Sequence, residues 1–334
     1  MTRTLEYDLS GLLPYINWGY FFHAWAFPAR FATVGNVHDC PACLAAWAAS
    51  FSAGNRAQAD EAVRLYKDAT GLLRRLGGKY KARARFGLYA AVSEGDDIWV
   101  KVPDDVSTPI YNKEYPPACV RKDRDGAAQV RLPFLRQQHS RAGEPCLCLS
   151  DFIAPHGKAA AADGMPVAST IGVFAATADV GPEEQPSGDD YGRMLVQTLC
   201  DRLAEAAAER MHEEVRTKFW GYAPDEHLSP AELFAEKYAG RRPAVGYPSL
   251  PDQSLIFLLD RLLDFGRIGI TLTENGMMRP HAAVAGLLLG HPATRHFAVG
   301  PIDRVQLHDY ACRRGLSCDA AAKFLRGNIP ASET

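Results

Sequence analysis

The spacing of apolar positions along the chain predicts several amphipathic helices. The longest covers about Asp189 to Phe219, where apolar residues recur every four positions. Gly221 and Pro224 follow this stretch and are expected to end the helix. Its apolar stripe consists of Leu195, Leu199, Leu203, Ala207, Met211 and Val215. Two Ala-rich helices are predicted within 41–76, and shorter helices at Pro230–Tyr238 (with Ser229 as the N-cap), Leu255–Phe265, Val305–Arg314 and Cys318–Arg326.

Alternating apolar and polar residues predict strands elsewhere. The segment from Phe86 to Val102 alternates around Gly95-Asp96-Asp97, which indicates a β-hairpin with an Asp/Gly turn. Further strands are predicted at Val130–Leu135, Cys146–Ile153, Ser169–Ala176, Gly269–Thr273 and His296–Val299. Because the strands and helices do not alternate regularly, the order favours the α+β class with an antiparallel sheet.

Composition and charge narrow the function classes. The chain has 334 residues, 47% hydrophobic and 23% charged, which is the usage of a globular protein with a sizeable core. Its 37 Lys and Arg nearly balance 39 Asp and Glu, so nothing favours nucleic-acid binding. The longest apolar run, Ala282 to Leu289, is too short to cross a bilayer, and the first eight residues lack the apolar stretch of a signal peptide. We therefore expect a cytoplasmic protein that binds neither nucleic acid nor membrane.

The eight cysteines include one metal-like spacing, Cys40-Pro41-Ala42-Cys43, preceded by His38-Asp39. A structural zinc site normally takes four ligands from two such pairs. The second pair is missing, since Cys146 and Cys148 are separated by only one residue. We therefore expect no metal, and reduced, mostly buried cysteines. A redox or metal role for Cys40 and Cys43 is the alternative.

The proline-rich stretch at residues 242–251 carries candidate binding chemistry. Its prolines and its glycine predict a rigid extended loop, in which Gly246 lets another group approach the main chain closely. Arg242 offers a planar fork for a carboxylate, and Tyr247 offers a ring face and a hydroxyl. Such a loop suits a zwitterionic amino acid or a flat, partly cationic ligand. An ordered structural loop is the alternative.

Two further features lie outside this loop. Asp201 and Glu205 are four residues apart on the long helix and so share a face, and neither has a Lys or Arg four residues further on. They could face a cation or form a solvated helix face. The aromatic segment from Tyr15 to Phe22 could line a pocket or pack in the core.

Together these stretches resemble the activation domain at the C-terminal end of cobalamin-dependent methionine synthase. The resemblance spans roughly residues 13–328 and is strongest at Leu135–Gln138, Leu149–Pro155, Gly172–Ala175, Asp189–Tyr191, Asp201–Ala206, Trp220–Pro224, Glu236–Tyr238, Arg242–Pro248, Leu272–Glu274, His291-Pro292 and Asp309–Ala311.

The resemblance implies an α+β, C-shaped single domain around a central twisted antiparallel sheet with flanking helices. Within it we expect an aromatic N-terminal segment (1–30), a partly inserted helical region (29–76), and the sheet and helices (80–334). It implies a methyltransferase-type enzyme that binds S-adenosylmethionine (SAM) along the 242–251 loop.

The resemblance also implies roles for individual residues. Arg242 would bind the methionine carboxylate, and Ala244 and Tyr247 would contact the cofactor through backbone and ring. Glu205 would lie near Arg242 and the ligand. Asp201 would belong to the surface that meets the cobalamin-carrying partner.

Two positions depart from the family's pattern. Asn17 stands where the family has Asp, and His296-Phe297 replaces a Tyr-Tyr pair close to the ligand. His296 could act as a general base or as a polar filler. The expected cofactor-binding residues are Asn17, Glu205, Arg242, Ala244, Gly246, Tyr247 and His296, with Glu205 and His296 also as catalytic candidates.

The resemblance leaves three functions open. The first is a reactivation subunit that methylates the cobalamin of a separate corrinoid-binding methyltransferase subunit with a flavodoxin-like reductant. The chain's nearest approach to a cobalamin-binding motif, Asp225 to Pro230, ends in Pro, so cobalamin would come only through that partner. The second, suggested by Asn17 and His296, is a cobalamin-independent SAM transferase with a small-molecule acceptor. The third is a SAM-binding protein without turnover.

Overall fold

The structure is a computed structural model that describes residues 1–102, 119–123, 126–155, 170–181, 184 and 188–330. One sheet dominates it, with strands β1 (Thr2–Asp8), β2 (Lys81–Glu94), β3 (Asp97–Lys101), β4 (Val120–Lys122), β5 (Ala128–Pro133), β6 (Thr170–Thr177) and β9 (Ala283–Leu288). A separate two-stranded sheet joins β7 (Thr271–Leu272) to β8 (Met278–Arg279). The helices are α1 (Trp18–Ala24), α2 (Pro41–Ala49), α3 (Ala53–Leu76), α4 (Asp190–Glu214), α5 (Pro230–Phe234), α6 (Leu255–Leu263), α7 (Arg304–Arg314) and α8 (Cys318–Phe324).

The main sheet is antiparallel throughout and remains open. Its strand order is β4-β5-β3-β2-β6-β9, and β1 also pairs with β2. The long β2 pairs with β1 and β6 along its first part and with β3 at its end, where the pair Glu94↔Asp97 closes the predicted hairpin. The predicted α+β class with an antiparallel sheet and flanking helices is confirmed.

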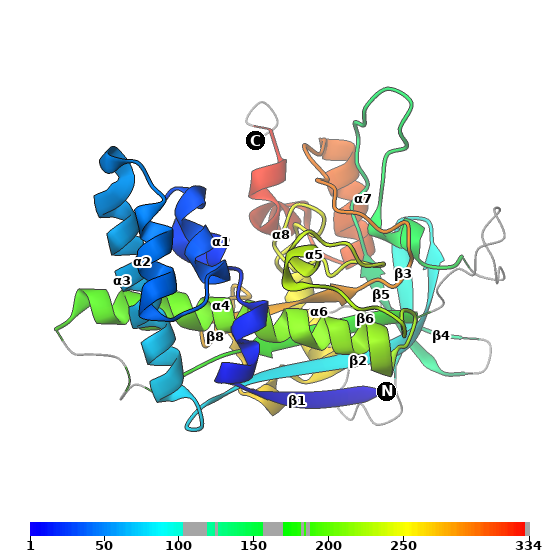
Figure 1. Cartoon of the computed structure of the whole chain (residues 1–334). Coiled ribbons are helices and arrows are strands. Elements are labelled where there is room, and N and C mark those ends of the chain that lie inside the picture. Colours follow the sequence, from blue (N-terminus) through cyan, green and yellow to red (C-terminus); the bar gives the residue numbers. More distant parts are fainter. Residues whose placement is uncertain (103–118, 124–125, 156–169, 182–183, 185–187, 331–334) are drawn as a thin grey trace.

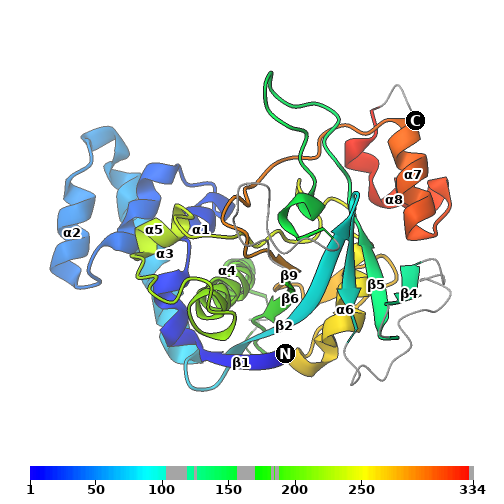
Figure 2. The same ribbon diagram turned by 90° about the vertical axis from the view of Figure 1, so that its right-hand side faces the viewer.

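Helices cover both faces of the sheet. Phe174 and Ala176 of β6 belong to the core under α4, while the alternate residues Val173 and Ala175 belong to the core under α6. Figures 1 and 2 show α4 and α6 on opposite sides of the central strands. The N-terminal helices and the pair α7–α8 project at the two ends of the sheet, which gives the molecule an open, C-like outline (Figure 1).

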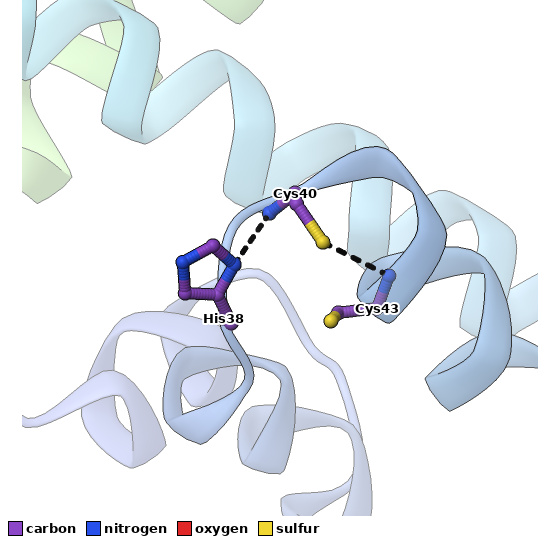
Figure 3. A group of neighbouring side chains, drawn as sticks. All are labelled: His38, Cys40 and Cys43. Carbon is purple, nitrogen blue, oxygen red and sulfur yellow. Dashed lines mark hydrogen bonds between the residues drawn. The ribbon is translucent and has the colours of Figure 1, made fainter.

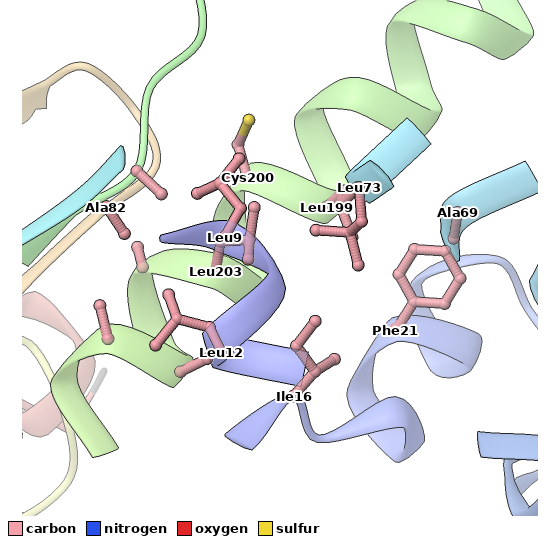
Figure 4. Close-up of a cluster of buried hydrophobic side chains, with 14 of the residues drawn as sticks. Leu9, Leu12, Ile16, Phe21, Ala69, Leu73, Ala82, Leu199, Cys200 and Leu203 are labelled. Carbon is pink, nitrogen blue, oxygen red and sulfur yellow. The ribbon is translucent and has the colours of Figure 1, made fainter. Parts of the chain in front are cut away.

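The predicted apolar stripe of the long helix is buried as expected. Figure 4 shows Leu203 of α4 beside Leu9 of the N-terminal turn and Leu199 of α4 beside Leu73 of α3, all within one buried cluster. A π-helical turn, Val215–Phe219, extends α4 to the predicted end. Gly221 follows with a φ of 72°, a left-handed conformation that ends a helix at little cost for glycine.

Most predicted elements are present, but two strands are wrong. The segment Cys146–Ile153 is irregular with a 3-10 turn, because side chains satisfy its backbone: the Cys148 N–H donates to Asp151 and the Leu147 N–H to Gln137. The stretch His296–Val299 is not a strand either, and the Val299 N–H donates to the Pro248 carbonyl. Strands β1, β4, β8 and β9 were not predicted.

The cysteines, all of them among the described residues, form no disulfide bonds with one another. All eight cysteines are free, as predicted, but only Cys119, Cys148 and Cys200 are buried, so the expectation of mostly buried thiols is wrong. Within the described part of the chain, no helix is both long and apolar enough to cross a membrane.

Candidate functional site

A cavity of about 730 Å³ lies between the 242–251 loop, α4 and the N-terminal segment. It brings together the predicted residues Asn17, Glu205, Arg242, Ala244, Tyr247 and His296. Its wall also contains Tyr15, Tyr20, Arg202, Glu209, Leu233, Phe234, Glu236, Tyr238, Pro243, Pro248, Ser249, Val284, Phe297 and Ala298. Gly246 and Asp201 do not line it.

The first part of the loop follows the outer edge of β9. The Leu287 N–H donates to the Pro243 carbonyl at 2.9 Å, and the Val245 N–H donates to the Ala285 carbonyl at 3.0 Å. A Cβ at Gly286 would lie only 2.2 Å from the Pro243 oxygen, so glycine permits this close approach. The sheet therefore fixes the backbone from which Arg242 and Ala244 reach the cavity.

Gly246 shapes the loop rather than lining the cavity. Its φ is 86°, and a Cβ here would lie 2.6 Å from Gln253 Oε1. The turn is closed by the Gly246 N–H donating to Leu250 and the Leu250 N–H donating to Tyr247. This turn leaves the Tyr247 side chain 55% exposed at the cavity rim.

Arg242 is held by an acid that sequence reasoning did not place in the site. Its Nη1 and Nη2 donate to Oε2 of Glu209 at 3.2 and 3.1 Å, and both side chains are largely buried. Burial alone would lower the pKa of Arg242, but the charges of Glu209, Tyr238 and Glu205 raise it overall. The signal for Glu209 was its position four residues after Glu205, on the same helix face.

A fully buried histidine lies behind this ion pair. His212 Nδ1 is 3.5 Å from Arg242 Nη1, and its ring meets that of Tyr238 edge-on at 5.2 Å. Burial, then the charges of Arg216, Arg242 and Arg241, holds the pKa of His212 well below its usual range. The neutral ring can accept a hydrogen bond from Arg242 through Nδ1, which helps to fix the guanidinium in place.

The part of the cavity wall next to this pair is acidic and aromatic. The charge of Glu205, followed by burial, raises the pKa of Tyr247, which places these two side chains within electrostatic reach. Tyr20 is 63% exposed, and the guanidinium of Arg202 lies 5.9 Å from its ring centroid. The cavity wall therefore carries two accessible tyrosine rings and the carboxylate of Glu205.

Asn17 has a local structural role in addition to its place in the wall. It is the N-cap of α1, where its Oδ1 accepts a hydrogen bond from the Gly19 N–H at 3.0 Å. Asn and Asp cap helices about equally well. Asn17 thus caps the helix without placing a charge in the cavity.

His296 and Asp201 each pair with a neighbour. His296 Nε2 lies 3.1 Å from Glu236 Oε1, and this hydrogen bond is the main cause that lowers the pKa of Glu236. Asp201 Oδ1 lies 3.4 Å from His281 Nδ1. The structure thus places His296 in the cavity wall and Asp201 outside it, on the same helix as Glu205.

An open antiparallel sheet with a ligand-sized cavity between a proline-rich edge segment and a long helix defines an α+β ligand-binding module. The chain belongs to the family "Vitamin B12 dependent methionine synthase, activation domain", whose model matches residues 8–315. It is similar to the crystal structure of the MetH reactivation domain bound to AdoHcy, with a TM-score of 0.75 and 33% identity over 98% of this chain and 90% of that chain. The family resemblance is confirmed.

Proposed function

We propose that this chain binds SAM in the cavity and supplies its methyl group to cobalamin held by a separate corrinoid-binding methyltransferase subunit. The observation that carries the proposal is the convergence of Arg242, Glu205 and Tyr247 on one cavity of about 730 Å³. Family membership supports the reaction. The similar MetH domain is bound to AdoHcy, which is SAM without its methyl group, and this supports the choice of ligand.

The Arg242–Glu209 pair matches the amino-acid end of SAM. The guanidinium fork suits the ligand's carboxylate, and a carboxylate suits its ammonium group. Glu209 Oε1 is buried and has no hydrogen-bond partner among the described residues, so one oxygen of this acid remains available for such a donor. In this proposal the ligand's carboxylate binds Arg242 and its ammonium group binds Glu209, while the two side chains stay paired with each other.

The neighbouring residues of the cavity wall suit the remainder of the ligand. Glu205 would face the positive sulfur, and the exposed rings of Tyr20 and Tyr247 offer surfaces for a cation or for the adenine. Bound SAM supplies an electrophilic methyl group, which is transferred when an external nucleophile attacks it in line as the carbon–sulfur bond breaks. The chain's residues therefore have to hold and orient the ligand, without moving a proton.

The catalytic candidates take electrostatic and positioning roles in this mechanism. Glu205 would stabilise the sulfonium in the bound state. His296, already hydrogen-bonded to Glu236, would position the wall of the cavity and is not required as a base. Asp201 would face the corrinoid partner, and a flavodoxin-like reductant would supply the electron that returns oxidised cobalt to its nucleophilic state.

The alternative, a SAM transferase with a small-molecule acceptor, was suggested by Asn17 and His296. Both residues have structural partners, the Gly19 N–H and Glu236. These departures from the family's pattern therefore do not require a new chemistry, which favours the corrinoid acceptor.

The test has two stages. Calorimetry should first show SAM binding that is lost or weakened in Arg242→Ala. Incubation of the chain with SAM, reduced flavodoxin and a cob(II)alamin-loaded corrinoid protein should then produce methylcobalamin and S-adenosylhomocysteine together. Absence of SAM binding would overturn the proposal. SAM binding without methyl transfer would indicate a non-catalytic role, and S-adenosylhomocysteine formed with a small-molecule acceptor alone would support the transferase.

A further inference from the structure

A cluster of metal-ligating side chains lies outside the cavity of the proposed function, in the N-terminal helical region. His38, Cys40 and Cys43 each offer one ligand atom, and these atoms all lie within 4.8 Å of one another. Figure 3 shows the three side chains gathered at the start of α2. Exposed His38 and Cys43 flank the partly buried Cys40, so an ion could reach them from solvent.

We propose that His38, Cys40 and Cys43 form a binding site for one Zn²⁺ ion with a fourth coordination position open to water or an added ligand. Two sulfurs and one imidazole nitrogen form a ligand set that suits zinc. In a tetrahedral site with ordinary zinc bond lengths, neighbouring ligand atoms lie roughly 3.5–3.8 Å apart. Since the ligand atoms lie within 4.8 Å of one another, they would have to approach by at most about an ångström to reach this geometry.

The local structure preorganises the ligands. Cys40 is the N-cap of α2, and its sulfur accepts a hydrogen bond from the Cys43 N–H at 3.3 Å. The first turn of the helix therefore brings both sulfurs to the same side. His38 Nδ1 accepts from the Cys40 N–H at 3.3 Å, which holds the imidazole beside the same turn. A ring nitrogen has one lone pair, so Nδ1 would exchange this hydrogen bond for the ion where it is the coordinating atom. Backbone N–H groups at a helix start also favour the thiolate form that binds metal.

The neighbouring acid does not complete the coordination sphere. Asp39 forms an ion pair with Arg74 of α3, which turns its carboxylate to another partner. The site therefore has three protein ligands, the number found in zinc sites that keep an open position. His38 and Asp39 also line a cavity of about 520 Å³ with Trp18, Tyr66 and Arg74, so an added ligand would have room beside the ion.

The sequence argument against a metal was the missing second cysteine pair. That argument applies to closed structural sites with four protein ligands. It does not exclude an open site, and the imidazole that completes the set stands only two residues before Cys40.

A second His/Cys group provides a matched control. His308 contacts Cys318 through Nδ1 at 3.4 Å and Cys312 through Nε2 at 3.7 Å. Opposite ring nitrogens point to the two sulfurs, so one ion cannot bind all three residues. A variant lacking Cys312 and Cys318 removes the same number of surface thiols without touching the proposed site.

The test measures bound metal in the full-length, reduced protein. After dialysis against Zn²⁺, elemental analysis should give near one equivalent per chain. Co²⁺ substitution should give sulfur-to-cobalt charge-transfer absorption and the intense visible bands of tetrahedral Co²⁺. Cys40→Ser/Cys43→Ser should lose both signals and His38→Ala should weaken binding, whereas Cys312→Ser/Cys318→Ser should retain them.

Three results would overturn the zinc site. They are no stoichiometric zinc in the reduced protein, zinc binding that survives Cys40→Ser/Cys43→Ser, and a Cys40–Cys43 disulfide that forms readily while the reduced protein binds no metal. The last result would indicate a dithiol redox pair instead. SAM affinity measured on the same variants reports the other cavity, so failure of the zinc site and failure of the proposed function remain distinguishable.

Discussion

Both terminal nitrogens of Arg242 donate to the same oxygen of Glu209, at 3.2 and 3.1 Å. A guanidinium in this arrangement is already neutralised and fixed before any ligand arrives. The addition of a ligand carboxylate to this pair would cost less than the burial of a new cation, because the desolvation of Arg242 has already taken place. We therefore expect the proposed site to select a ligand that carries both a carboxylate and an ammonium group.

Replacement of Arg242 by Ala should weaken SAM binding by about 1.5–3 kcal/mol, the range for loss of a charge-assisted hydrogen bond. The SAM affinity of Arg242→Lys should lie between that of the parent chain and that of Arg242→Ala, because lysine keeps the charge but lacks the planar fork. Isothermal titration calorimetry measures both. Arg295→Ala removes an equal charge near the cavity without altering its wall. Unchanged affinity in Arg242→Ala, or equal loss in Arg295→Ala, would contradict the assignment.

Asp201 should affect methyl transfer without affecting SAM affinity. It lies on α4 with Glu205 but outside the cavity, beside His281. Asp201→Asn should therefore leave the calorimetric dissociation constant unchanged and slow the formation of methylcobalamin on the corrinoid partner. A drop in SAM affinity equal to the drop in transfer rate would place Asp201 in the ligand site instead.

Asn17 should contribute to stability through its cap. Asn17→Ala removes the acceptor for the Gly19 N–H and should lower the free energy of unfolding by about 1 kcal/mol. Asn17→Asp keeps a capping oxygen, so its stability should stay near that of the parent chain while its added charge changes SAM affinity. Urea denaturation and calorimetry on the two variants separate these effects, and an equally destabilised Asn17→Asp would argue against the capping role.

Gly246→Ala should destabilise the chain by about 1–2 kcal/mol, because φ is 86° there and only glycine adopts this region at low cost. The new methyl group would also press on Gln253. The control is Gly71→Ala in α3, where nothing lies within 4 Å of the new Cβ. That change should stabilise the chain by about 0.5–1 kcal/mol. Denaturant unfolding that shows the same sign for both would refute the turn argument.

The sequence allowed the binding loop to be predicted, because the prolines, glycine and Arg242 are contiguous. The α4 stripe was predictable for a similar reason, since its spacing repeats over many turns. Glu209 and His212 were not predicted as site residues, because their meaning depends on contact with Arg242, which is 33 and 30 positions away. Strand β9 was missed because a short, fully buried apolar run lacks the alternation that marks a half-exposed strand.

The three-ligand cluster was partly visible in the sequence. The spacing of Cys40 and Cys43 was recognised, but the contribution of His38 depends on the turn before α2, which directs the imidazole back over the Cys40 N–H. The strand predicted at Cys146–Ile153 failed because Arg136 binds Asp96 and Asp151 there, and side-chain bonds replace a ladder. Such local competition does not appear in an apolar–polar pattern.

His212 should make the stability of the chain depend on pH. Burial, followed by the charges of Arg216, Arg242 and Arg241, holds its pKa well below 6.5 in the folded chain. As pH falls through 6.5, the unfolded chain binds this proton while the folded chain does not, so the free energy of unfolding should decrease. One such group contributes at most ~1.4 kcal/mol per pH unit.

His212→Gln removes this titration, so its stability should fall less steeply with decreasing pH than that of the parent chain. The range to measure is pH 7.5 to 5.5, roughly one unit either side of the usual histidine pKa. The slope is the readout, because the loss of a buried ring also shifts the absolute stability of the variant. His23→Gln serves as the control, since the His23 side chain is exposed in the folded chain. Urea unfolding at a series of pH values measures all three slopes. Parallel slopes for the parent and His212→Gln would mean that His212 takes up its proton equally in the folded and unfolded chains. The assignment of a neutral His212 ring behind Arg242 would then be wrong.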